Sequence, residues 1–214
     1  MMTGTRVCIA ALCVLAFAGL LAAQDEKNEI GGSIGRIFIS DQTIHASIPD
    51  PVIHSGKGLS FEGDYARRLI ITPIFAISGE VPVLYNYKEK LNAGGFGAAV
   101  VPVSYKELFV TPAARLNLFP ATAVSPWVSF GAGFGYISQR NVLDFGSGPG
   151  NPGKSNTGAA IQGGAGLDVK LWRSLGIRGE VRDFWSQHPD FPLAPTGRSR
   201  QHNYFVGGGA FWRF

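Results

Sequence analysis

Cysteine is scarce in this 214-residue sequence, and both copies, Cys8 and Cys13, lie in an apolar stretch near its start. That stretch runs from Val7 to Leu21 and is followed by the charged run Asp25–Lys27, which is typical of a secretory signal peptide. We therefore predict a signal peptide over residues 1–23, with an uncleaved anchor as the alternative and the cleavage position left open. The mature chain would have no thiol, which excludes disulfides, thiolate metal sites and cysteine nucleophiles.

Charge is also sparse, and long hydrophobic runs are missing after the first 23 residues. Only 16% of the residues are charged, against about 25% in ordinary soluble domains. The net charge of +4 is too weakly basic to suggest a nucleic-acid partner. No later segment approaches the roughly 20 apolar residues of a membrane-spanning helix. Residues 24–214 are predicted to form one domain without a helical anchor.

Helical periodicity is nearly absent too, and alternating segments take its place. They predict eight strands, near residues 29–40, 58–66, 68–84, 107–119, 126–139, 157–172, 174–187 and 201–214. Tight turns alternate with long links: the turns are expected at Arg67, 120–125 and 173–174, and the links at 41–57, 85–106, 140–156 and 188–200. Transmembrane barrels have this asymmetry between short turns and long outer loops. We predict an all-β, eight-stranded antiparallel up-and-down transmembrane β-barrel.

The predicted strands have one apolar and one polar face, and the polar faces would line the lumen. They collect five acidic and five basic residues: Glu62, Asp64, Glu80, Asp168 and Glu180 with Arg115, Lys170, Arg178, Arg182 and Arg213. Because charges in a narrow, poorly hydrated space are costly unless paired, we expect an interlocked network that fills the barrel. The register of the first strand stays open, since the phase that places Arg36 inside also places Phe38 inside.

Aromatic residues crowd the ends of the predicted strands, as in the interfacial girdles of a membrane barrel. Those near the turns are Tyr65, Phe119, Trp127, Trp172, Trp212 and Phe214, and those near the long links are Tyr85, Tyr136, Trp185 and Tyr204. The alternative is that these rings pad a soluble core. Pro73, Pro82 and Pro112 fall inside predicted strands. Each removes a backbone N–H that would donate a hydrogen bond to the neighbouring strand, so we expect bulges or shifted boundaries there.

The last strand is apolar or aromatic at every second position: Tyr204, Val206, Gly208, Ala210, Trp212 and Phe214. In this ending the sequence resembles the small outer-membrane β-barrel proteins of bacteria, the OmpA-like and OmpX-like group, and the resemblance covers essentially the whole mature chain. It implies a location in the bacterial outer membrane, in contact with outer-membrane lipid. It also implies that Tyr204, Val206, Trp212 and Phe214 form a C-terminal signal for the barrel-assembly machinery.

Two glycine-rich patterns match nucleotide-binding motifs but lack their context. Residues 148–155 satisfy the phosphate-loop expression G-x-x-x-x-G-K-S, yet they contain two prolines and are followed by another glycine-rich strand rather than a helix. We interpret them as the tip of an outer loop. Residues 131–135, GAGFG, are interpreted as a strand whose glycines face a crowded lumen.

The sequence has no clear catalytic or metal-binding constellation. Ser186 and His188 could share a face near Glu180 or Asp183, but nucleophilic catalysis needs hydrogen-bond geometry that sequence adjacency does not provide. The other histidines, at positions 45, 54 and 202, are too scattered to suggest a metal site. We expect no enzymatic activity, no cofactor and no metal.

Function is expected in the outer loops, because variable chemistry is usually carried by loops on a rigid scaffold. The segment Leu91–Val103 is unusually apolar for a loop and could extend the wall as a hairpin, fold over the mouth or contact a partner. A barrel of eight strands is wide enough only for its own side chains or one small ligand. We predict a structural or surface-interaction role; the alternatives are a narrow channel for ions or small solutes and, less favoured, a secreted soluble ligand-binding barrel. The loop partner stays open.

Overall fold

The computed structural model of the protein describes residues 26–39, 42–43, 52–55, 57–89, 91–93, 104–140, 155–187 and 200–214. The long strands are β1 (Asn28–Ile39), β4 (Lys57–Ile71), β5 (Phe75–Glu89), β7 (Ser104–Val110), β8 (Ala113–Leu118), β9 (Val124–Arg140), β10 (Ser155–Lys170), β11 (Leu175–Gln187) and β12 (Arg200–Arg213). Three short strands are β2 (Gln42–Thr43), β3 (Val52–Ser55) and β6 (Leu91–Ala93). In the part of the chain that the structure describes, no helix is long and apolar enough to cross a membrane.

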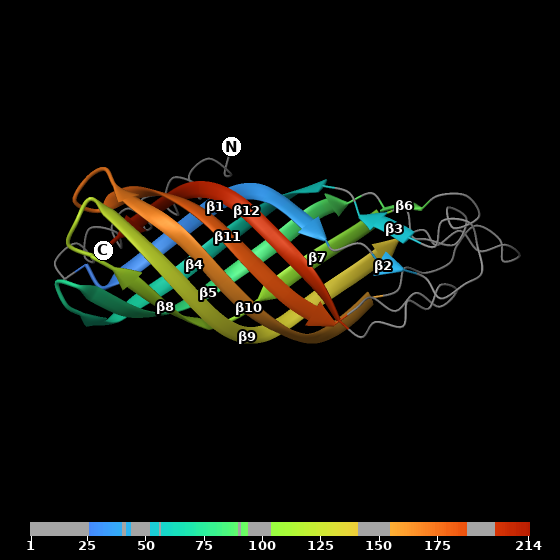
Figure 1. Ribbon diagram of the computed structural model, residues 1–214, viewed down its shortest axis with the longest axis horizontal. Helices are drawn as coiled ribbons and strands as arrows, with labels where there is room; N and C mark the ends of the chain where they lie inside the picture. The colour runs from blue at the N-terminus through green and yellow to red at the C-terminus, as the bar shows by residue number, and fades with distance from the viewer. Residues whose placement is uncertain are drawn as a thin grey trace, which may run out of the picture.

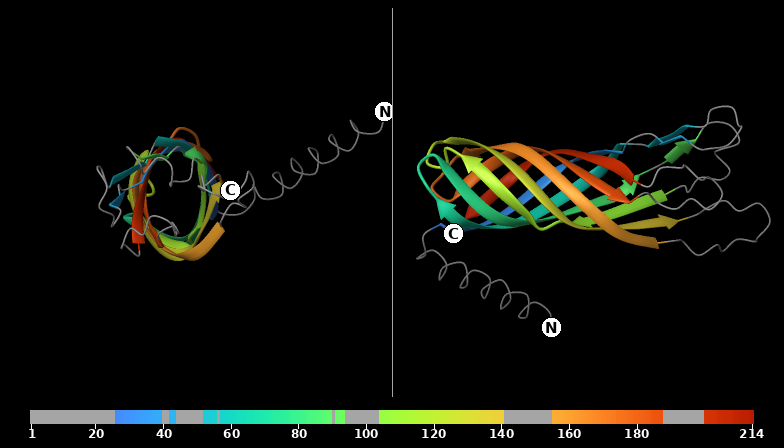
Figure 2. Two further views of the ribbon diagram at one scale, coloured as in Figure 1. Left: turned by 90° about the vertical axis from the view of Figure 1, so that its right-hand side faces the viewer. Right: turned by 60° about the horizontal axis from the view of Figure 1, so that its bottom comes forward.

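The long strands form one closed antiparallel barrel (Figures 1 and 2). Each strand pairs with its neighbours in the order β1-β4-β5-β7/β8-β9-β10-β11-β12, and β12 pairs back onto β1. Strands β7 and β8 both lie between β5 and β9, so they are two halves of one interrupted strand and the barrel has eight staves. The predicted eight-stranded up-and-down barrel is confirmed.

The two ends of the barrel differ. Short turns join β4 to β5, β8 to β9 and β10 to β11 at the end where Asn28 and Phe214 also lie, on the left in Figure 1. We call this the turn end and the opposite end the loop end. At the loop end, β3 pairs with β2 and β6 in a small sheet. The apolar segment 91–103 therefore begins as a strand at Leu91–Ala93, while residues 94–103 lie outside the described residues.

One predicted turn is wrong. Arg67 lies inside β4, which continues to Ile71, and the chain reverses at Thr72–Ile74 instead. The Thr72 hydroxyl donates to the Phe75 carbonyl at 2.7 Å and accepts from the Phe75 amide at 3.0 Å, which fixes this turn. The turns at 119–123 and 171–174 match the prediction within the expected margin. The short connections thus all gather at one end.

The three prolines sit where the barrel wall tolerates a missing donor. Pro73 falls in the turn after β4, and Pro112 lies in the gap between β7 and β8. Pro82 is inside β5, and its carbonyl accepts from Thr111 beside that same gap at 3.3 Å. In an antiparallel sheet the N–H and C=O of one residue point to the same neighbouring strand. The backbone N–H that Pro82 lacks would therefore also have pointed to the gap between β7 and β8. The expected irregularities are confirmed as a shifted boundary and a break.

Candidate functional site

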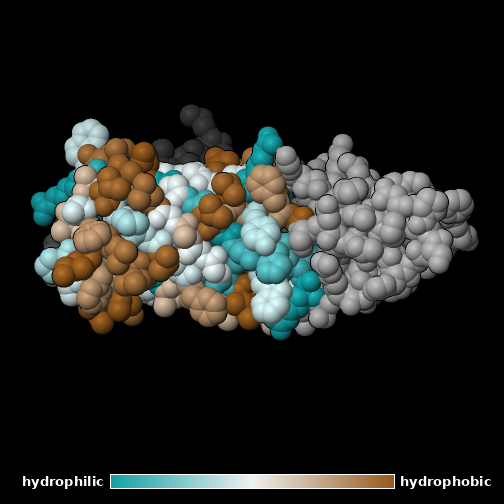
Figure 3. Space-filling model, in the orientation of Figure 1, coloured by the Kyte–Doolittle hydropathy of each residue, from teal (hydrophilic) through white to brown (hydrophobic). Residues whose placement is uncertain are grey.

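The outer and inner faces of the barrel have opposite character. Large apolar side chains face outward along the strands, with Phe130 exposed over 68% of its surface and Ile34 over 60%. Figure 3 shows such residues, in brown, over much of the wall, with hydrophilic residues, in teal, towards both ends. The inner face is lined by buried charged and polar side chains. A soluble ligand carrier has its apolar face inside, so the alternative of a secreted soluble barrel is wrong.

The register of β1 is resolved by the same division. Glu29, Ser33 and Ile37 point inward and are buried, whereas Arg36 and Phe38 both lie on the outer face. The first strand thus contributes a carboxylate to the lumen and a guanidinium to the outside.

Aromatic residues form two exposed bands, with one exception to the prediction. At the turn end Tyr65, Phe119, Trp172 and Trp212 are exposed and Phe214 is half-buried; at the loop end Tyr85, Tyr136, Trp185 and Tyr204 are exposed. Trp127 was predicted to belong to the turn-end band, but it points into the lumen and is only 2% exposed. Its indole N–H donates to Asp168 at 3.0 Å, and its ring lies against the guanidinium groups of Arg178 and Arg182. The hydrogen bond and the cation–π contacts favour the inward position of the ring.

A first cluster of charges surrounds Arg178 in the turn-end half of the lumen. The Arg178 guanidinium donates to Glu29 at 2.6 Å, to Asp64 at 3.1 Å and to Asp168 at 2.8 Å. Arg213 binds two of the same carboxylates, Glu29 at 2.7 Å and Asp168 at 3.0 Å. These bonds tie β1, β4, β10, β11 and β12 together through the centre of the barrel.

Arg115 links this cluster to a second one. Its guanidinium donates to Glu29 at 2.6 Å and lies 3.3 Å from a carboxylate oxygen of Glu80. Both of its partners are buried, as is Arg115 itself. The two clusters therefore form one continuous ionic network.

The second cluster surrounds Arg182, four residues from Arg178 towards the loop end on β11. The Arg182 guanidinium donates to Glu80 at 2.8 Å and to Glu180 at 2.9 Å, and lies 3.4 Å from Glu62. Ser129 adds a further contact at 3.4 Å. Every member of this cluster is buried, and the Arg182 guanidinium is paired with three carboxylates inside the barrel.

The structure brings together nine of the ten lumen charges inferred from the sequence: Glu62, Asp64, Glu80, Arg115, Asp168, Arg178, Glu180, Arg182 and Arg213. Lys170 shares their face but is the last residue of β10 and is partly exposed at the rim. Glu29 was missed because the register of its strand was open, although it contacts three arginines. The buried network has six carboxylates for four guanidinium groups, and Arg68 and Lys170 add two partly buried cations on the same inner face.

An apolar layer crosses the lumen between this network and the loop end. It consists of Ile37, Leu84, Phe109, Ala160, Phe184 and Phe205, all fully or almost fully buried. The rings of Phe109 and Phe184 are stacked with their centroids 5.0 Å apart. Such a layer excludes water from the middle of the lumen.

Inward-facing glycines make room for the large rings. Phe109 is paired across the ladder with Gly135, and Trp127 with Gly166. A side chain at either glycine would collide with the ring, so the absence of a Cβ is what allows the rings to lie against the wall. Residues 131–135 belong to strand β9, which confirms their interpretation as a strand.

A cluster of polar side chains lies between the apolar layer and the loop end. Gln201 donates to Glu107 at 3.3 Å and to Asn203 at 3.0 Å, and Asn203 in turn donates to the hydroxyl of Ser186 at 3.0 Å. Ser186 thus points into the lumen, as does Glu180, whereas Asp183 faces outward. These three residues do not form one constellation.

The remaining motif residues are placed only in part. His188, His45 and residues 148–154 lie outside the described residues, and Ser155 begins β10. His202 is on the outer face and its Nδ1 lies 2.7 Å from Asp183. Across the described ranges, no group of three or more histidine, cysteine or acidic side chains is arranged to hold a metal ion.

The sequence matches no protein-family model and no curated protein. Solved structures are similar in fold. The crystal structure of Neisserial surface protein A superposes with a TM-score of 0.56 at 11% identity, over 87% of this chain and 97% of that chain. The outer membrane protein OprG from Pseudomonas aeruginosa gives a TM-score of 0.52 at 11% identity, over 88% and 95% of the two chains. This chain has the fold of a small outer-membrane β-barrel. Together with its apolar exterior, that fold makes it a transmembrane barrel, and the resemblance noted in the sequence is confirmed at the level of the fold.

Proposed function

We propose that this barrel is an integral protein of the bacterial outer membrane that anchors surface loops and does not conduct. The observation that carries the proposal is the filled lumen, in which the apolar layer around Phe109 and Phe184 lies across a space already occupied by ion pairs. An ion passing through would have to break buried charge pairs and then cross a layer without polar partners, and both steps are costly. The role is structural or adhesive and includes no enzymatic step.

The proposal extends to export and assembly. Residues 1–23 act as a cleaved signal peptide, and Tyr204, Val206, Trp212 and Phe214 act as the signal for the barrel-assembly machinery. In support, Tyr204, Val206 and Trp212 all lie on the outer face of β12, where a partner can reach them before the barrel closes. The surrounding partner of the folded barrel is outer-membrane lipid.

Single cysteines test the orientation, because the only native cysteines, Cys8 and Cys13, fall within the predicted signal peptide. We expect Asn151→Cys, between β9 and β10, to react with a membrane-impermeant maleimide on intact cells. Arg173→Cys, in a turn at the other end, is expected to react only after the outer membrane is permeabilised. Labelling of Arg173→Cys alone on intact cells would reverse the orientation and remove the surface role.

A planar-bilayer recording tests the closed lumen. Refolded protein is expected to give no discrete conductance steps, since the apolar layer and the ion pairs lie across a lumen of only eight strands. A mobility shift on boiling in dodecyl sulfate gels provides the control that the inserted sample is a folded barrel. Reproducible steps from a sample that passes this control would instead favour the narrow channel.

A further inference from the structure

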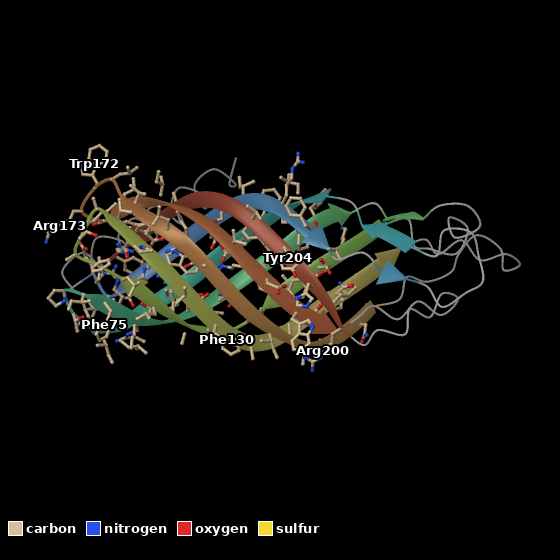
Figure 4. All side chains as sticks on the ribbon, viewed as in Figure 1. Phe75, Phe130, Trp172, Arg173, Arg200 and Tyr204 are labelled. Carbon is tan, nitrogen blue, oxygen red and sulfur yellow. The ribbon has the colours of Figure 1, made fainter. Side chains whose placement is uncertain are left out.

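The outer face of β11 and β12 carries a group of charged and polar side chains at its loop end. We call this set the outer patch; it consists of Asp183, Trp185, Arg200, His202 and Tyr204. In the ladder Asp183 lies opposite Tyr204 and Trp185 opposite His202, which brings the side chains together on one face. Figure 4 shows Arg200 and Tyr204 in the half of the barrel nearer the loop end.

The members of the outer patch hold one another in place. The ring of His202 stacks on Trp185 at a centroid distance of 6.0 Å and on Tyr204 at 5.7 Å. The Arg200 guanidinium lies 4.5 Å from the centroid of Trp185. A stacked guanidinium keeps its N–H groups at the edge of the stack, where they remain able to donate. The patch is thus a row of ordered rings with a cation at its end.

The charge of this region is positive. The carboxylate of Asp183 is engaged by His202 at 2.7 Å. Arg200 and the outward-facing Arg36 of β1 have no carboxylate partner among the described residues. Arg36 lies opposite Val206, two residues along β12 from Tyr204 and on its outer face, so it flanks the patch on the side of the turn end.

The position of these cations in the wall restricts what they meet. Trp185 and Tyr204 belong to the loop-end aromatic band, which marks the interface of a membrane barrel. A basic side chain on the lipid face costs little near the interface, and its apolar stem lets the charge reach towards the headgroups. The neighbouring outward residues Val181 and Val206 are apolar and exposed. A molecule bound here would contact the Arg200 cation at one end and hydrocarbon-like wall at the other.

We propose that the outer patch, through Arg200, binds the phosphate of an anionic lipid headgroup in the leaflet at the loop end. Arginine matches phosphate with paired N–H donors, and the apolar wall below accommodates the acyl chains of the same lipid. The inference rests on the proposed location in a membrane and adds a lipid class to it.

Native mass spectrometry of the barrel released from nanodiscs of equimolar phosphatidylcholine and phosphatidylglycerol tests this inference. The wild type is expected to retain phosphatidylglycerol in excess over its share of the nanodisc. Because one basic residue near an anionic headgroup contributes about a fivefold preference, Arg200→Ala is expected to reduce the excess about fivefold. Arg36→Ala is expected to reduce it less, because Arg36 faces β12 six residues from Arg200. Arg200→Lys, which keeps the charge but loses the planar fork, should fall between the wild type and Arg200→Ala.

Arg173→Ala is the matched control, because Arg173 is 91% exposed in a turn at the opposite end. It is expected to keep the full excess of phosphatidylglycerol. Retention of the two lipids in their bulk ratio by the wild type would overturn the inference, as would an equal loss in the Arg173→Ala control. Failure of the membrane proposal has a different result: the protein would fold in buffer without lipid or detergent and would show no boiling-dependent mobility shift.

Discussion

Replacing Arg178 with alanine is expected to lower the free energy of unfolding by about 3–5 kcal/mol, the usual cost of removing one partner from a buried ionic cluster. Arg178 is the common donor to Glu29, Asp64 and Asp168, and these carboxylates would be left close together with fewer positive partners. The measurement is the urea midpoint of the detergent-refolded barrel, followed by tryptophan emission.

Arg173→Ala provides the comparison for this variant. Arg173 lies 3.5 Å from Glu26 but is 91% exposed, so its removal should change the stability by no more than about 0.5 kcal/mol. Equal midpoints for the two variants would mean that the lumen is hydrated and that its charges are screened. A large loss for Arg178→Ala alone is the result that a packed ionic interior requires.

Trp127→Ala is expected to destabilise the barrel by about 3–5 kcal/mol, because it leaves a large cavity in a packed interior. The substitution also removes the indole donor to Asp168 and the ring beneath the guanidinium groups of Arg178 and Arg182. The same urea titration measures the effect, with the fraction folded followed by gel mobility, since the loss of this tryptophan alters the emission signal.

Trp172→Ala is the comparison for a tryptophan at the lipid interface rather than in the lumen. Trp172 is 75% exposed at the turn end, where Figure 4 shows it projecting from the barrel, and its removal should cost much less than that of Trp127. If Trp127→Ala were as mild as Trp172→Ala, Trp127 would not be packed inside. Trp127 would then belong to the aromatic band at the turn end, as the sequence predicted.

The inner face of the barrel was largely predictable because polar and apolar residues alternate in most strands. Charges such as Asp168, Arg178 and Glu180 alternate with apolar residues along their strands, and a period of two leaves only one arrangement with the apolar side towards lipid. The register of β1 was left open, because its outward Arg36 and inward Ile37 break the polarity rule. Glu29 was left out of the predicted lumen network for the same reason.

Other features depended on information that the alternation does not contain. The turn was predicted at Arg67, but β4 continues through three further apolar residues to Ile71, and the actual turn is fixed by the hydroxyl of Thr72. Trp127 has the correct phase for the lumen, yet its size and its position near a turn suggested the membrane interface. The ring–glycine contacts that hold Phe109 and Trp127 against the wall require the strand register, which the sequence alone does not provide.

The seam between β1 and β12 has a consequence for the order of folding. Asn28 and Phe214 exchange two backbone hydrogen bonds of 2.9 Å, and Glu29 binds Arg213 across 184 residues of sequence. Pairing over such a separation carries a large loop-closure cost, so hairpins such as β10–β11 should form first and the seam last. Because the two ends of the described barrel are adjacent, a circular permutant that joins Phe214 to Asn28 through a short linker and opens at residue 151 would turn this slow closure into a local hairpin. The same cut makes β9–β10 the new seam, so the permutant should reach the same final barrel with β9–β10 rather than β1–β12 as the last pairing to form.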